Sequence, residues 1–157
     1  MRHHLIFSVD HVLCALPLAG THIVLRMVQM MPPADNRHGL AGAVNVHGEV
    51  LPAYSVRSLF GLPDRPPRLT DRLVVADAGG RSIALWVEEA HVPQQNPVLP
   101  PQTEILEKGK EVVPGINLTD EGMFIIRDLL HFISPEYAVD LKEAFARAGE
   151  GKGGRHA

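Results

Sequence analysis

The sequence has little of what several common protein classes require. Its single cysteine, Cys14, cannot form an intrachain disulfide and fits a reducing compartment. Leu13 and Ala15 flank Cys14, which predicts a buried thiol that packs as a small hydrophobic side chain. The 15 Lys and Arg residues are fewer than the 18 Asp and Glu residues. Without a basic excess to attract a phosphate backbone, we do not expect a nucleic-acid partner.

Long hydrophobic runs are also missing. A helix that crosses a bilayer needs about 18 uninterrupted apolar residues, and the sequence contains no such run. The apolar residues near the N-terminus resemble a short signal peptide, but Asp10 and His11 interrupt the apolar run and Pro17 follows it. We therefore expect a cytoplasmic protein that does not insert directly into a membrane.

The motifs of common catalytic sites are absent. The sequence contains no nucleophile elbow, no Walker loop and no dinucleotide-binding glycine motif. Its nine histidines include no pair at a helical ligand spacing with a nearby acid. Glu88 and Glu89 are adjacent, and because neighbours on a strand diverge, we interpret them as a solvated strand end. We predict a binding module rather than an enzyme, with no metal site and no cofactor.

Proline and glycine, by contrast, are abundant, with 13 and 14 residues spread along the chain. This distribution favours many short strands joined by turns, and 157 residues suffice for one domain. A helical turn that runs into a strand is predicted for Ile23–Met31, and an extended crossover for Val92–Gln102. The remaining predicted strands are Leu5–Val9, Val12–Leu16, Ala43–Val46, Val50–Tyr54, Leu73–Ala76, Ile83–Val87, one strand from Val112-Val113 through Gly115–Leu118, and Met123–Ile126.

The stretch from Gly39 to Gly61 is the most informative part of the chain. Apolar runs on either side of Gly48 predict two strands joined by a tight turn. Ser55 is placed to cap a helical turn at Val56–Phe60. Pro52 lies inside the second run, and because proline cannot donate a hydrogen bond to a ladder, it predicts an edge or bulged strand there.

The same stretch resembles the signature of CheW-type chemotaxis coupling proteins. In words, that signature is glycine, two apolar residues, asparagine, an apolar residue, arginine and glycine, then apolar residues with a proline, then aspartate-leucine-arginine. The matching positions are Gly42, Asn45, Gly48, Pro52 and Arg57. A similar strand end in the family, valine-aspartate-x-valine, corresponds here to Val87-Glu88-Glu89-Ala90.

Two positions depart from the family signature. His47 stands where the family usually has arginine, and Ser55 where it usually has aspartate. Histidine is only about a quarter charged at pH 7, and serine keeps no charge, only a capping oxygen. Our hypothesis is that these two positions form an ion pair in the family and that this chain has lost both partners together.

A second stretch repeats the central pattern at an offset of roughly 70 residues, too long for a solenoid repeat. Asn117, the turn glycine Gly122 and Arg127 parallel Asn45, Gly48 and Arg57. This echo indicates two similar β subdomains. Farther on, Ser134 followed by Pro135 predicts the start of a C-terminal helix.

The resemblance implies a fold, an activity and partners. The expected fold is mainly β, with two five-stranded SH3-like β-barrels around a shared core over residues 3–134, then a C-terminal helix at 135–149 and a flexible tail at 150–157. The expected activity is that of a non-catalytic cytoplasmic adaptor between the cytoplasmic tip of a chemoreceptor and the regulatory domain of a CheA-type histidine kinase. The implied binding residues are Asn45, Val46, His47, Gly48 and Glu49, and the implied structural residues are Gly42, Pro52, Ser55 and Arg57.

Two alternatives stay open. One is a stand-alone SH3-like module that binds a peptide or a small ligand outside any signalling array. The other is a coupling protein of an array that does not control swimming, such as one that controls pili.

Overall fold

The computed structural model describes residues 4–33, 35, 37–91, 110–139, 141, 143, 144 and 146. As predicted, short strands dominate, and no helix within these ranges has the length and apolar character needed to span a membrane. The strands are β1 (His4–Val9), β2 (Val12–Pro17), β3 (Thr21–Arg26), β4 (Leu40–Val46), β5 (Glu49–Ser55), β6 (Arg72–Ala78), β7 (Arg81–Val87), β8 (Glu89–His91), β9 (Lys110–Val113), β10 (Ile116–Leu118) and β11 (Met123–Ile126). The helices are η1 (Leu18–Gly20), α1 (Val56–Leu59), α3 (Leu129–Phe132) and η3 (Pro135–Tyr137).

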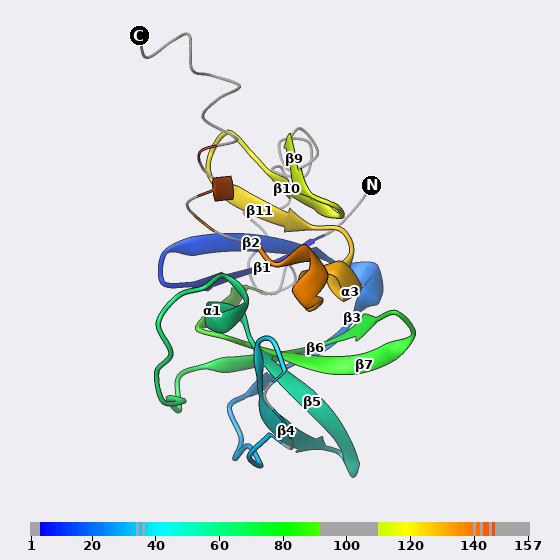
Figure 1. Ribbon diagram of the computed structural model, residues 1–157. Helices are drawn as coiled ribbons and strands as arrows, with labels where there is room; N and C mark the ends of the chain where they lie inside the picture. Colours follow the sequence, from blue (N-terminus) through cyan, green and yellow to red (C-terminus); the bar gives the residue numbers. More distant parts are fainter. Residues whose placement is uncertain are drawn as a thin grey trace, which may run out of the picture.

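The strands form two sheets, which confirms the predicted mainly-β architecture. Sheet A has the order β8-β1-β2-β11-β10-β9, and sheet B has the order β3-β6-β7-β5-β4. Sheet A thus has six strands where the resemblance implied five. Figure 1 shows sheet A above sheet B, with α1 and α3 at the junction between them. Sheet A takes strands from both ends of the described chain, whereas the strands of sheet B come from one continuous stretch, residues 21–87.

The two sheets share one pairing pattern. In sheet A the antiparallel hairpin β1–β2 is joined through a parallel β2–β11 pair to the hairpin β10–β11. In sheet B the hairpin β6–β7 is joined through a parallel β7–β5 pair to the hairpin β4–β5. A four-residue helix follows β5 directly and follows β11 after two residues, and these helices are capped by Ser55 and Asp128 respectively. The echo found in the sequence therefore corresponds to two units of the same topology.

The main hydrophobic core lies between the two sheets. Phe60, which ends α1, packs on Phe124 of β11 and Phe132 of α3, with ring centroids 5.0 and 5.3 Å apart. Fully burying side chains of this size contributes about 1.5–3 kcal/mol each. Cys14 is fully buried in the same core, as predicted, and burial raises the pKa of its thiol well above the ordinary range.

A second core lies on the opposite face of sheet B. Because strand side chains alternate, Val74 and Leu85 face the main core while Leu73 and Trp86 face the second one. Met30 packs against this second core from the segment after β3. A bridge between the next residue, Met31, and Ala43 of β4 brings this segment back to the opposite edge of the sheet.

The prediction of a helical turn within Ile23–Met31 is wrong. The structure has the edge strand β3, in which Val24 pairs with Val74 and Leu25 with Leu73 of β6. Val24 packs against the main core and Leu25 against the second core. Both faces of β3 are therefore apolar, and that two-sided pattern imitates the spacing of a helical face.

Pro52 does not mark an edge strand, because β5 lies between β7 and β4. Pro52 pairs with Ala43, whose backbone N–H and C=O both bond to Met31 instead, at 2.9 and 2.8 Å. The ladder to β7 begins only at Ala53. Neither of the neighbouring strands, β4 and β7, requires a hydrogen-bond donor from Pro52, so an interior strand tolerates the proline. The register shift of this pair lies in β4, between Leu40 and Gly42.

Other local predictions differ in detail from the structure. The single predicted strand around Pro114 and Gly115 is two antiparallel strands, β9 and β10. Ser134 accepts a hydrogen bond from the Glu136 amide, but it begins the 3-10 turn η3, and Ala138 is extended with ψ 136°. Beyond that break, residues 141, 143, 144 and 146 are helical. The predicted crossover Val92–Gln102 and the predicted tail 150–157 lie outside the described residues.

Candidate functional site

The turn between β4 and β5 holds the binding residues implied by the sequence. His47 and Gly48 both have positive φ, 52° and 87°, which is the type I′ turn favoured in two-residue hairpins. The side-chain oxygen of Asn45 accepts a hydrogen bond from the Gly48 amide at 2.9 Å and fixes the turn. Asn45, His47, Gly48 and Glu49 are exposed, and Val46 is half-buried. The turn thus presents polar side chains on a defined backbone.

Apolar surface adjoins this turn. Val50, directly after Glu49, is 57% exposed although it lies in a strand. An exposed valine beside a polar, hydrogen-bonded turn is the composition of a small contact surface. We call residues Asn45, Val46, His47, Gly48, Glu49 and Val50 the hairpin tip.

Gly42, the first residue of the signature, has a steric role. A Cβ on Gly42 would lie 2.2 Å from the carbonyl oxygen of Met31, which pairs alongside β4 at this point. Only glycine lets the two backbones approach closely enough for the Met31–Ala43 bridge.

Ser55 and His47 lie at opposite ends of β5. Ser55 is buried and accepts a hydrogen bond from the Ser58 amide at 3.2 Å, which caps α1 as predicted. The seven residues of β5 extend for about 20 Å, since a strand rises roughly 3.3 Å per residue. Side chains at positions 47 and 55 therefore cannot form an ion pair, and our hypothesis of a jointly lost pair is wrong.

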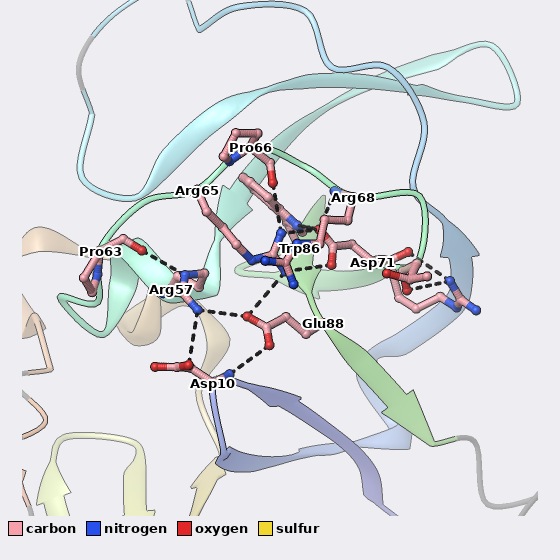
Figure 2. A network of polar contacts seen from close by, with 11 residues as sticks. Asp10, Arg57, Pro63, Arg65, Pro66, Arg68, Asp71, Trp86 and Glu88 are labelled. Carbon is pink, nitrogen blue, oxygen red and sulfur yellow. Dashed lines mark hydrogen bonds and ion pairs between the residues drawn. The ribbon is translucent and has the colours of Figure 1, made fainter.

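Arg57 joins the two sheets through a polar network (Figure 2). Its guanidinium donates to Glu88 at 2.9 Å and to the Pro63 carbonyl at 2.9 Å, and it lies 3.8 Å from the carboxylate of Asp10. Glu88 in turn accepts from the Asp10 amide at 3.1 Å, and its own amide donates to the Ser8 carbonyl. Asp10 belongs to the β1–β2 turn of sheet A, and Glu88 directly follows β7 of sheet B.

A second cluster centres on Asp71, whose side chain is only 2% exposed. Arg65 binds this carboxylate through two nitrogens at 2.8 and 2.9 Å, a bidentate ion pair. The Arg68 amide and the Trp86 indole N–H donate to it at 2.8 and 2.9 Å. The indole N–H of Trp86 therefore has a buried acceptor. Arg65 also lies 3.4 Å from Glu88, so Figure 2 shows one continuous network.

Electrostatics keep both carboxylates ionised. Burial by itself would raise the pKa of Asp71, but hydrogen bonds from Arg65, the Arg68 amide and Trp86 outweigh burial and hold that pKa below its ordinary value. For Glu88, burial is likewise outweighed by the Asp10 amide, by Arg57 and by the charge of Arg65, and its pKa is also lowered. The interpretation of Glu88 as a solvated strand end is wrong, whereas Glu89 is 71% exposed.

Sequence reasoning missed Arg65 and Asp71 because they lie in a proline-rich loop without periodicity. One signal was present for Asp71, since a mostly buried Trp86 requires an acceptor for its N–H. Glu88 also occupies the position of the aspartate in the family's strand end, valine-aspartate-x-valine, but that match does not indicate which residues Glu88 contacts. Among the described residues, no three His, Cys, Asp or Glu side chains gather closely enough to hold a metal ion.

Comparison with known protein families shows the family to which the chain belongs. The model of the CheW-like domain matches residues 3–136, which include both sheets and the whole polar network. The chain belongs to the CheW-like family. Among solved structures, this CheW-like chain is similar to the scaffolding protein TtCheW from Thermoanaerobacter tengcongensis, with a TM-score of 0.59 and 23% sequence identity. That match covers 83% of this chain and 92% of the other, and it shows the shared fold. No curated protein matches the chain in sequence.

Proposed function

We propose that this CheW-like chain is a non-catalytic cytoplasmic adaptor that couples the cytoplasmic tip of a chemoreceptor to the regulatory domain of a CheA-type histidine kinase. The observation that carries the proposal is the family match across residues 3–136, because CheW-type proteins are adaptors without enzymatic activity. The division into a CheW-like domain at 3–134, a helix at 135–149 and a tail at 150–157 remains a prediction.

We assign the hairpin tip to partner binding. Its turn is fixed by the Asn45–Gly48 hydrogen bond, so binding costs little ordering of the backbone. Its area is small, and a single small contact gives weak affinity. In an array, simultaneous engagement of many such contacts supplies the avidity that one contact lacks.

The other signature residues serve this surface indirectly. Gly42 lets the Met31 segment pair alongside β4, Pro52 occupies a position where no donor is required, and Ser55 caps α1. Arg57 connects the turn of sheet A to sheet B. We propose that these four residues hold the geometry of the two sheets and make no direct contact with a partner.

Co-sedimentation with a receptor fragment and with the kinase regulatory domain tests the proposal. Val50→Ser and His47→Asn change the hairpin tip, and His47→Gly removes the ring while permitting the same positive φ. Arg81→Gln, at the start of β7 after the β6–β7 turn, is the matched control because Arg81 is also exposed. We expect the tip variants to weaken binding of a partner several-fold while the melting temperature stays unchanged.

Two outcomes would count against this account. Wild-type binding of both partners, unaffected by every tip variant, would remove the hairpin tip from the binding surface. A wild-type chain that binds neither partner but retains binding to peptides would favour the stand-alone module instead.

A further inference from the structure

A concave surface lies between the loop that precedes β6 and the strand β8. It encloses about 460 Å³, and its lining includes Arg68, Arg72 and His91. None of the hairpin-tip residues contributes to it. We call it the arginine pocket.

Two of the three carboxylates in the arginine pocket are already paired with arginine side chains. Asp71 is bound by Arg65 through two nitrogens, and Glu88 is bound by Arg57. The third acid, Glu89, is largely exposed and lies 3.8 Å from His91. These pairings use the positive charge of Arg65 but leave the other two arginines of the pocket unopposed.

Arg68 and Arg72 therefore supply the free positive charge. The guanidinium of Arg72 bonds only to the backbone carbonyls of Thr70 and Asp71, at 2.8 and 3.0 Å. No carboxylate among the described residues forms an ion pair with either arginine. A guanidinium held by neutral carbonyls keeps its charge available for an incoming anion.

Leu69 stands between these arginines in the sequence and is 89% exposed, more than any other large hydrophobic residue among those described. A leucine held almost wholly in water gains free energy when another surface covers it, about 1.5–3 kcal/mol for complete burial. A small free anion would leave Leu69 uncovered. A polypeptide segment is large enough to enter the pocket and also to cover Leu69, which is adjacent in sequence to the lining residues Arg68 and Thr70.

We propose that the arginine pocket and Leu69 bind an acidic segment of a partner protein, in which a carboxylate reaches Arg68 and Arg72 and an adjacent apolar side chain covers Leu69. This inference rests on the proposed adaptor function and gives the adaptor a second binding surface. Figure 1 places the loop after α1 on the left of sheet B and the β4–β5 turn at the lower right. The two surfaces thus lie at different parts of sheet B.

NMR titration of the full chain with a short synthetic peptide of alternating leucine and glutamate tests the inference. We expect amide shifts at Arg68, Leu69 and Arg72, and weaker binding as salt is raised. Arg68→Gln should weaken the affinity about two- to fivefold, since exposed charge pairs contribute modestly. Leu69→Ser should weaken it about tenfold, while Arg81→Gln should leave it unchanged.

A matched peptide with lysine in place of glutamate is the charge control. Equal binding of both peptides, or unchanged affinity in both pocket variants, would overturn the inference. The same variants are then assayed for co-sedimentation with the receptor fragment and the kinase domain. Loss of one partner in Arg68→Gln and Leu69→Ser supports the inference, whereas full retention of both partners overturns it and leaves the proposed adaptor function standing.

Discussion

Replacing Asp71 with alanine removes the acceptor at the centre of the polar network. The carboxylate receives two bonds from Arg65 and one each from the Arg68 amide and the Trp86 indole. In the alanine variant these donors lose their acceptor in a place that water reaches poorly, because the Asp71 side chain is 2% exposed and that of Arg65 is 13% exposed. The variant therefore leaves a partly buried guanidinium whose remaining carboxylate is Glu88, 3.4 Å away and already bound by Arg57.

The expected cost follows from that geometry. Breaking a buried ion pair by removing one partner typically costs about 3–5 kcal/mol. For a chain of this size, such a loss lowers the melting temperature by about 10 °C. Asp71→Asn keeps one acceptor oxygen without the charge, so we expect a smaller loss, between that of alanine and the wild type.

Urea unfolding followed by tryptophan fluorescence measures the effect directly, because Trp86 is the only tryptophan in the sequence and touches the mutated group. Asp77→Ala is the matched control. Asp77 lies on β6, the strand that begins directly after Asp71, but its side chain is 46% exposed and pairs with an exposed His22. We expect the control to lose less than about 1 kcal/mol. A loss for Asp71→Ala no larger than that of the control would refute the assigned role of the network.

The pH dependence of the same variants gives a signed test. A carboxylate whose pKa is lowered in the folded state stabilises the protein above its unfolded pKa, about 3.9 for aspartate, and loses that effect as the pH falls through the lower folded value. The difference in unfolding free energy between the wild type and Asp71→Asn should therefore stay constant from about pH 7 to pH 5 and shrink below about pH 4. A difference that grows on acidification would contradict the direction of the shift.

The remaining predictions concern the signature residues. Gly42→Ala should destabilise the fold by about 1–3 kcal/mol, because the added Cβ meets the Met31 carbonyl. In the control Gly20→Ala, the added Cβ meets nothing within 4 Å, so this variant should be tolerated. Equal melting temperatures of the two variants would contradict this prediction. Ser55→Ala removes the acceptor of the Ser58 amide and should cost about 1 kcal/mol in urea unfolding, and no measurable loss would show that the cap does not stabilise α1.

Much of the fold could be predicted from local chemistry. Gly79 and Gly80 lie between the predicted strands Leu73–Ala76 and Ile83–Val87, and both have the positive φ that a type I′ turn requires. Asp10 and His11 are a less favoured turn pair, yet the predicted strands Leu5–Val9 and Val12–Leu16 beside them pair as a hairpin, and both turn residues adopt positive φ. These predictions succeeded because the residues that form a turn, and the apolar pattern that marks a strand, each lie within a few consecutive positions.

The polar network could not be predicted in the same way. Glu88 lies 31 residues from Arg57 and 78 from Asp10. The parallel pairing of β5 with β7 brings Arg57 to Glu88, and the pairing of β8 with β1 brings Asp10 there. The hypothesis of a lost ion pair between His47 and Ser55 failed for the same reason. The two residues are close in the sequence motif, but the extended strand β5 places them far apart in space. Topology, which the sequence pattern does not specify, decided both cases.

The central claim is that this CheW-like chain holds two other proteins together without chemistry of its own. Sedimentation of a membrane-bound receptor fragment, in the presence of the soluble kinase regulatory domain, tests that claim most directly. The account predicts that the kinase domain enters the pellet only when the chain is added and leaves it when the hairpin tip carries Val50→Ser. A kinase domain that stays in the supernatant at every concentration of a chain shown to be folded would contradict the account.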